Sequence, residues 1–154
     1  MPTPPASRSE RAHVLIVDGH SMIFQWPELR RLHQRKTAIA RQQLITLLTR
    51  YQDTSGTKVL AVFDGKGERT NEASEPGGIQ VFYSGAAKTA DSVIERIVAK
   101  YASIYAITVA TDDNLERQTV ESFGGEWMSS EQLALELRDA DTRLQDQIKH
   151  LKRR

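Results

Sequence analysis

The amino-acid sequence predicts an α/β protein with a mainly parallel central sheet. Three apolar runs, at residues 14–17, 58–63 and 104–110, are rich in β-branched residues and short enough to be strands buried on both faces. Stretches whose apolar residues recur at helical spacing lie between these runs. Strands that alternate with helices form right-handed βαβ crossovers, so we expect a three-layer α/β/α sandwich.

Turn and capping residues set the expected bounds of the helices in the first third of the chain. Pro27 is a good first residue for a short helix through Arg31. Apolar residues between positions 38 and 51 fall mostly at three- and four-residue spacings. That spacing predicts an amphipathic helix, and Gly56 marks where it ends.

The middle of the chain begins with a loop. Residues 65–78 are charged and glycine-rich, which predicts a flexible loop, and residues 79–83 alternate as a strand does. Thr89 is the expected N-cap of the next helix. The buried stripe expected for that helix consists of Val93, Ile94, Ile97 and Val98.

The last third should form a helix, a short strand and a long helix. The first helix runs from about residue 114 to 123, and residues 126–128 are typical of a short edge strand. Ser129 or Ser130 caps the final helix. Its apolar stripe consists of Leu133, Leu137, Ala140, Leu144, Ile148 and Leu151.

The length of the chain suits one domain, which we expect over residues 12–154 behind a flexible N-terminal segment at residues 1–11. The absence of cysteine excludes a disulfide framework and a thiolate zinc site. Residues 1–8 lack the apolar core of a signal peptide, and no run is long enough to span a membrane. We therefore expect a soluble cytoplasmic protein without a membrane partner.

Acidic residues gather where the predicted strands end. Asp18, Asp64 and the pair Asp112 and Asp113 each follow a strand, and Asp91 lies at the start of a helix. In a parallel sheet these positions share the carboxyl edge, where ligands bind. Carboxylates without cysteine or clustered histidine suit Mg²⁺ or Mn²⁺, and such a cation would relieve their mutual repulsion.

Each of these acids also has an ordinary structural interpretation. An aspartate at the end of a strand is often a helix N-cap or a turn residue, above all Asp64 and Asp112. Glu95 shares a helix face with Asp91 and either supports the site or faces solvent. His20 could act as a general base, contact RNA or only donate a hydrogen bond. Trp26 could stack on a base or pack the adjacent helix.

Basic residues crowd one region although the net charge is only +1. The same residues could form an ordinary solvated helix face, but a patch of cations beside an acidic site can bind a polyanion, and the position of the patch favours binding. The cations concerned are Arg30, Arg31, Arg35 and Lys36.

A set of motifs in one order resembles the YacP-like NYN domain family of PIN-like nucleases. The motifs cover residues 18–23, 26–29, 62–65, 88–91 with Glu95, and 109–113 through Glu116. The resemblance implies a PIN-like α/β/α sandwich and metal-dependent cleavage of RNA. It makes Asp18, Asp91 and Asp113 the catalytic acids and metal ligands, and Asp64 a further acid at the metal site.

The same motifs place supporting residues around these acids, namely Ser21, Thr89, Glu95, Thr111 and Asp112. Two positions depart from the family pattern. The family usually has tyrosine and asparagine where this chain has His20 and Ser21, and it commonly has serine at the position of Asp112. Ser21 can still donate and accept a hydrogen bond, but it is shorter than asparagine.

Three functions remain open from the sequence. The first is a metal-dependent endoribonuclease that acts on single-stranded RNA, with mRNA on the ribosome as one candidate substrate implied by the resemblance. The second is a PIN-like RNA-binding module with weak or lost catalysis, which the Ser21 replacement favours. The third is a phosphotransfer or phosphatase domain, because a strand-end aspartate can act as a nucleophile. The sequence predicts neither the RNA target, nor the preferred cation, nor the oligomeric state.

Overall fold

The computed structural model describes residues 7–65 and 78–152. Most of the predicted flexible segment 1–11 and of the predicted loop 65–78 lies outside the described residues. Residues 8–10 form one turn of 3₁₀ helix that leads into the first strand. Within the described ranges, no helix is long and apolar enough to cross a membrane.

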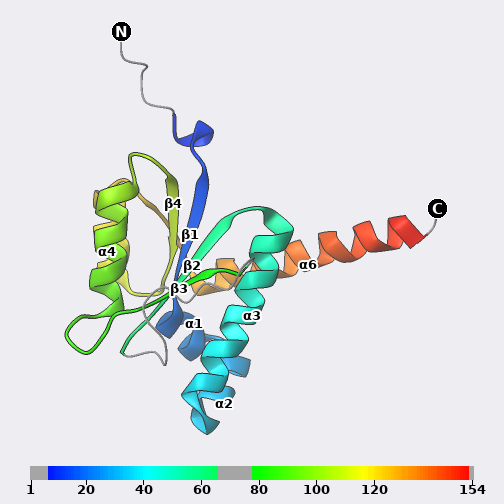
Figure 1. The fold of residues 1–154 in the computed structure, drawn as a ribbon, viewed down its shortest axis with the longest axis horizontal. Coiled ribbons are helices and arrows are strands. Elements are labelled where there is room, and N and C mark those ends of the chain that lie inside the picture. Colours follow the sequence, from blue (N-terminus) through cyan, green and yellow to red (C-terminus); the bar gives the residue numbers. More distant parts are fainter. Residues whose placement is uncertain (1–6, 66–77, 153–154) are drawn as a thin grey trace.

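The sheet has five parallel strands in the order β3-β2-β1-β4-β5, which confirms the predicted fold class (Figure 1). The strands are β1 (His13–Asp18), β2 (Lys58–Phe63), β3 (Gln80–Tyr83), β4 (Ala106–Ala110) and β5 (Glu126–Met128). Because β1 is central and the chain leaves it first toward β2 and later toward β4, the strand order reverses beside β1. In open α/β sheets ligands bind at the carboxyl ends of the strands at such a reversal.

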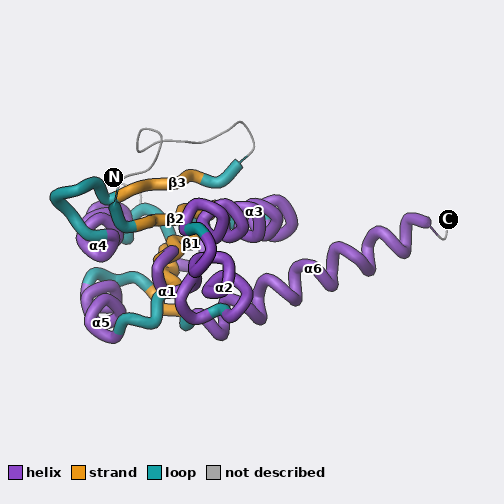
Figure 2. The backbone as a smooth tube through the Cα atoms, turned by 90° about the horizontal axis from the view of Figure 1, so that it is seen from below, coloured by secondary structure: helices purple, strands orange, loops and turns teal. Residues whose placement is uncertain are grey.

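Helices cover both faces of the sheet (Figure 2). One layer contains α1 (Gly19–Gln25), α2 (Pro27–Arg35), α3 (Thr37–Ser55) and α6 (Ser130–Lys152), and the other contains α4 (Ala90–Tyr101) and α5 (Asn114–Ser122). Alternation along β1 decides which side chain enters which layer. Leu15 and Val17 pack against the first layer, and Val14 and Ile16 pack against the second.

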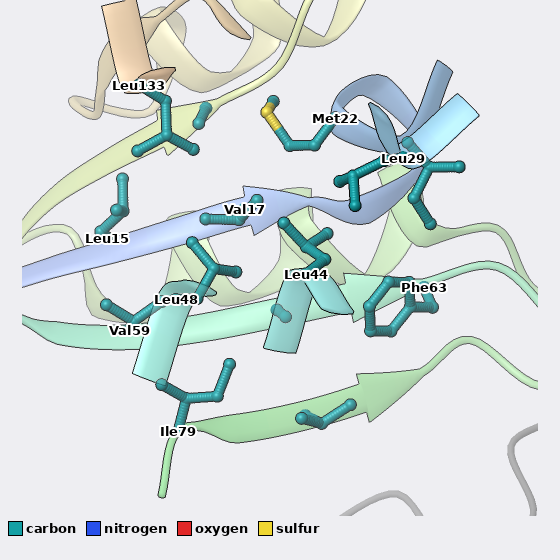
Figure 3. Close-up of a cluster of buried hydrophobic side chains, with 14 of the residues drawn as sticks. Leu15, Val17, Met22, Leu29, Leu44, Leu48, Val59, Phe63, Ile79 and Leu133 are labelled. Atoms are coloured by element: carbon teal, nitrogen blue, oxygen red, sulfur yellow. The ribbon is translucent and has the colours of Figure 1, made fainter. Parts of the chain in front are cut away.

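The core of the first layer lies under α3 (Figure 3). Leu44 and Leu48 of α3 are fully buried against Val17 and Val59 of the sheet. Phe63 closes this core at the carboxyl end of β2 and is only 2% exposed. A Cβ atom at position 19 would lie 2.4 Å from the Phe63 ring, so glycine is required where the chain leaves β1.

Four elements differ from the sequence prediction. The helix predicted to end at Arg31 continues to Arg35, and it is preceded by α1, which the sequence analysis did not predict. β4 begins at Ala106 and not at residue 104, because the chain first turns back from α4 with Ile104 57% exposed. The predicted stripe of α6 is buried only in its first part, since the helix extends beyond the body of the molecule (Figure 1).

Candidate metal centre

Three carboxylates meet at the carboxyl edge of the sheet. Asp18 is the last residue of β1, Asp91 is the second residue of α4, and Glu116 lies in the first turn of α5. One oxygen atom from each lies within 4.8 Å of those of the other two. Asp18 is 4% exposed and Glu116 only 1%. The two helices begin at this edge, so their N-terminal dipoles favour negative charge there.

Two hydroxyl groups orient the buried acids. Oδ2 of Asp18 accepts hydrogen bonds from Ser21 Oγ at 2.9 Å and from Thr111 Oγ1 at 3.0 Å. Thr111 Oγ1 also lies 3.1 Å from Oε2 of Glu116. Because a hydroxyl group has one proton, Thr111 can donate to only one of these carboxylates at a time. The cluster therefore contains fewer donors than its ionised carboxylates need.

Burial and mutual repulsion raise the pKa values of two of the acids. Burial is the largest cause for Glu116 and, with the neighbouring Asp91 and Asp18, raises its pKa to about 9. Burial also raises the pKa of Asp91, and the charges of Asp18 and Asp113 act in the same direction. Without a cation, Glu116 is therefore protonated at neutral pH.

The donor set fits a hard divalent cation. Within the described ranges, Oε1 of Glu116 is buried and has no hydrogen-bond donor. It can be satisfied either by a proton shared with Asp91 or by a cation. Three carboxylates without histidine or cysteine suit Mg²⁺ or Mn²⁺ better than Zn²⁺. The residues present thus have the chemistry of an Mg²⁺ or Mn²⁺ site.

We expect the metal-free protein to lose stability as the pH rises from about 6 to 9. The unfolded chain releases the Glu116 proton near the ordinary pKa of 4.5, whereas the folded protein keeps it until about 9. Between these values the folded state binds more protons, so a rise in pH favours unfolding, and Asp91 contributes with the same sign. Melting temperatures in EDTA should fall across this range, and less steeply for Glu116→Gln. Equal slopes for the two proteins would contradict the burial of an ionisable Glu116.

The other predicted acids accept hydrogen bonds from helix N-termini. Oδ1 of Asp113 caps α5 by accepting from the backbone N–H of Leu115 at 2.9 Å and of Glu116 at 3.3 Å. Asp112 accepts from the N–H of Ser130 at 2.8 Å, and Asp64 accepts from the N–H of Ala90 at 2.7 Å. Asp112 thus ties the end of β4 to α6, and Asp64 ties the end of β2 to α4.

Asp113 still lies close enough to Asp91 for its charge to raise the pKa of that residue. Its predicted role as a metal ligand stays a prediction, as do those of Asp18, Asp91 and Asp64. Ser21 and Thr111, predicted as supporting residues, lie in the hydrogen-bond network of Asp18.

Two further predicted supporting residues belong to α4 and its N-cap. Thr89 caps α4 by accepting from the N–H of Ser92, as the sequence predicts. Glu95 is one turn beyond Asp91 on α4 and is not one of the three clustered acids. The predicted RNA-binding cations of α2 and the following residue are exposed: Arg30, Arg31, Arg35 and Lys36.

Glu116 is the residue that the sequence analysis did not assign to the site. It appeared only as the end of a motif, although a usable signal was present. Glu116 lies three residues after the N-cap Asp113, a spacing that places an acid in the first turn of a helix at the edge where ligands bind. The same spacing is typical of a capping box, which is why the signal is ambiguous in sequence alone.

Comparisons with known proteins identify the family and support the fold. The model of the YacP-like NYN domain family matches residues 15–154. The uncharacterized protein YacP of Bacillus subtilis (strain 168) is 29% identical over 142 residues, which are 90% of this chain and 82% of that protein. The crystal structure of Rae1 (YacP) from Bacillus subtilis superimposes with a TM-score of 0.76 at 29% identity, covering 90% of this chain and 80% of that one. A point mutant of the same protein gives a TM-score of 0.77 at 28% identity, covering 90% of this chain and 82% of that one.

Proposed function

Since the chain belongs to the YacP-like NYN domain family, a nuclease-type function follows, and we propose that the protein is a metal-dependent endoribonuclease that hydrolyses phosphodiester bonds of single-stranded RNA. One observation carries the proposal beyond the family. A buried oxygen of Glu116 lacks a hydrogen-bond donor among the described residues and lies in a group of three carboxylates. A module that only binds RNA would gain stability from losing these repelling acids.

In this proposal Asp18, Asp91 and Glu116 hold the cation, Mg²⁺ or Mn²⁺. When bound, such a cation neutralises charge that develops on the phosphate during hydrolysis. Ser21 and Thr111 keep Asp18 oriented by donating to its Oδ2, so that the carboxylate need not reorganise. Positioning and electrostatics, and not a covalent intermediate, are the contributions expected of the protein.

Asp113, Asp112 and Asp64 have supporting roles in the proposal. Asp113 fixes the first turn of α5, on which Glu116 lies, because it accepts from the N–H of Glu116. Asp64 fixes the first residue of α4 next to Asp91. Their hydrogen bonds hold the two helices that carry cluster acids against the ends of the strands.

The exposed cations of α2 are proposed to contact RNA phosphates. We expect Arg30→Ala/Arg31→Ala to weaken RNA binding about equally for all sequences, because phosphate contacts carry no base information. Each lost contact should reduce the slope of log affinity against log salt concentration by about one. Fluorescence anisotropy over a salt series measures both effects.

A matched double variant is Lys149→Ala/Lys152→Ala, which removes two cations from the end of α6. It should leave RNA affinity and the salt slope unchanged. If the α2 variant binds RNA as the unaltered protein does at low salt, its cations form a solvated face and the phosphate assignment is wrong.

Cleavage of a circular RNA tests the proposed activity and its endonucleolytic character together. Purified protein should open the circle with Mn²⁺ and leave it intact with EDTA. RNA binding without cleavage in either condition would favour the alternative, an RNA-binding module with weak or lost catalysis, for which Ser21 in place of the family asparagine is the sequence argument. The proposed substrate range includes mRNA on the ribosome, for which the family resemblance is the support; cosedimentation with ribosomes tests it.

A further inference from the structure

Three side-chain rings pack against one another in series, the first pair tilted and the second edge to face, and we call this group the stack. The rings of His20 and Phe24 have centroids 4.3 Å apart with an interplanar angle of 36°. Phe24 then meets His33 of α2 edge-on, with centroids 4.8 Å apart. His20 follows Asp18 by two residues and is exposed. The stack therefore starts next to the candidate metal centre and leads away from it along α1 and α2.

The stack does not belong to the hydrophobic core. The buried face of α1 is supplied by Met22 and Ile23, which are 0% and 4% exposed. Phe24 lies on the other side of the helix and is 39% exposed. At the far end of the stack, His33 Nδ1 pairs with Thr37 Oγ1 at 3.2 Å, which fixes that ring. The ring of His20 is the open end.

Cations accompany the rings. Arg30 precedes His33 by three residues on α2, so the two side chains share a face of that helix. In the described part of the chain, the salt bridges use Arg8, Arg50 and Arg117 and none of the cations of α2. Exposed rings next to unneutralised arginine are the combination that binds single-stranded nucleic acid, by stacking on bases and attraction of phosphates.

Trp26, the other candidate for stacking, is occupied elsewhere. Its Nε1 donates to the backbone oxygen of Ser130 at 3.1 Å, and its ring packs against the core between α1 and α6. This contact holds α6 to the body of the protein and leaves Trp26 only half-buried at the junction.

We propose that His20 and Phe24, supported by His33, form a stacking subsite for an unpaired nucleobase of the RNA next to the scissile phosphate. The subsite rests on the proposed function, since its ligand is the same RNA. Because His20 lies in the first turn of α1, which begins directly after Asp18, a base stacked on its open face lies at the edge of the sheet where the acids gather. The occupant is a base and not a phosphate, since the apolar ring of Phe24 and the π-face of His20 attract a π-system.

The test measures how tightly the protein binds a short single-stranded RNA in EDTA. The measurement is repeated with a series of the same RNA in which one abasic nucleotide occupies a different position each time. We expect the abasic site to weaken binding roughly tenfold at one position only. His20→Ala should weaken binding of the intact RNA by about the same factor and remove the effect of the abasic site. His20→Phe should restore both, because it supplies a ring without the imidazole nitrogen atoms. Phe24→Leu keeps an apolar contact with α2, so its affinity for the intact RNA should lie between those of His20→Ala and His20→Phe.

Phe123→Ala is the matched control, since Phe123 is 47% exposed at the opposite end of α5, away from the acids. It should bind both RNAs as the unaltered protein does. The subsite is overturned if His20→Ala binds intact RNA normally, or if it weakens intact and abasic RNA equally. It is also overturned if His20→Phe fails to rescue. Cleavage of the intact RNA by the unaltered protein with Mn²⁺ distinguishes the two proposals. If the protein cleaves RNA but the His20 variants contradict the subsite, only the subsite is wrong. If the protein neither binds nor cleaves RNA, the proposed nuclease function and the subsite are both wrong.

Discussion

Replacing Glu116 with glutamine should abolish RNA cleavage and at the same time stabilise the metal-free protein near pH 8. The substitution removes a proposed cation ligand. Removing a residue that only hydrogen-bonds to a metal ligand costs up to roughly a hundredfold in activity, so the loss of cleavage rate should be larger than that. The stabilisation has a separate cause. Glutamine keeps the volume of the buried side chain and needs no proton, whereas Glu116, with its pKa near 9, favours unfolding at this pH.

Two readouts test the Glu116 prediction. Mn²⁺ should raise the melting temperature of the unaltered protein, because a ligand that binds only the folded state stabilises it. The same titration should leave Glu116→Gln unchanged. Each kcal/mol gained by the metal-free variant corresponds to an increase of about 2–4 °C in melting temperature for a chain of this size.

Glu121→Gln is the control on the same helix. Glu121 is exposed and pairs with Arg117 at 2.8 Å, so its replacement removes only a surface ion pair. That costs about 0.3–0.5 kcal/mol and should affect neither cleavage nor the response to Mn²⁺. If Glu116→Gln cleaves RNA at the normal rate, Glu116 is a structural acid and the cluster needs another third ligand.

Asp91→Asn should also lose cleavage and the Mn²⁺-induced increase in melting temperature. Asp91 is the more accessible member of the cluster, and its raised pKa comes first from burial and then from the charges around it. Asparagine relieves this repulsion while it retains the side-chain shape, so the fold should persist. Circular dichroism and cleavage rate, measured on the same preparation, test both parts of the prediction.

Glu95→Gln provides the comparison within α4. Glu95 is half-buried one turn beyond Asp91 and outside the three-carboxylate group. If Glu95 only supports the site, its replacement should lower the cleavage rate by no more than about a hundredfold and should not abolish cleavage. If Glu95→Gln proves inactive and Asp91→Asn remains active, the cation lies one helical turn farther along α4 than the proposal has it.

The sheet could be predicted from sequence because its strands are buried on both faces. Runs such as residues 14–17 and 59–63 are apolar without interruption, and this pattern indicates a strand between two helical layers. α1 could not be predicted because its seven residues are too few to show an apolar stripe, and an aspartate before it is as typical of a ligand site as of an N-cap. In the structure the Asp18 side chain makes no hydrogen bond to the helix backbone and instead accepts from Ser21 and Thr111. The length of α2 depends on packing against α1 and α3, which a local pattern does not contain.

The sequence predicts the edge of the sheet at which acids gather, but it does not predict that Glu116 is one of them. The topology brings the ends of β1, β2 and β4 to one edge, so a group of acids there follows from the sequence. Which carboxylate faces the centre depends on hydrogen bonds that only the folded backbone supplies. Asp112 and Asp113 are adjacent, yet each accepts a hydrogen bond from the N-terminus of a different helix. Glu116, in the first turn of α5, is the residue whose carboxylate joins those of Asp18 and Asp91.

The proposed metal centre is tested most directly by a crystal of the protein soaked in Mn²⁺, with an anomalous difference map calculated at the edge of the sheet. We expect one strong peak between the carboxylates of Asp18, Asp91 and Glu116, at the roughly 2.0–2.6 Å metal–oxygen distances of hard cations. The peak should be absent from crystals of Glu116→Gln grown and soaked in the same way. A peak held by Asp112 or Asp64 without Glu116, or no peak in the unaltered protein, would contradict the assignment of this cluster as the metal centre.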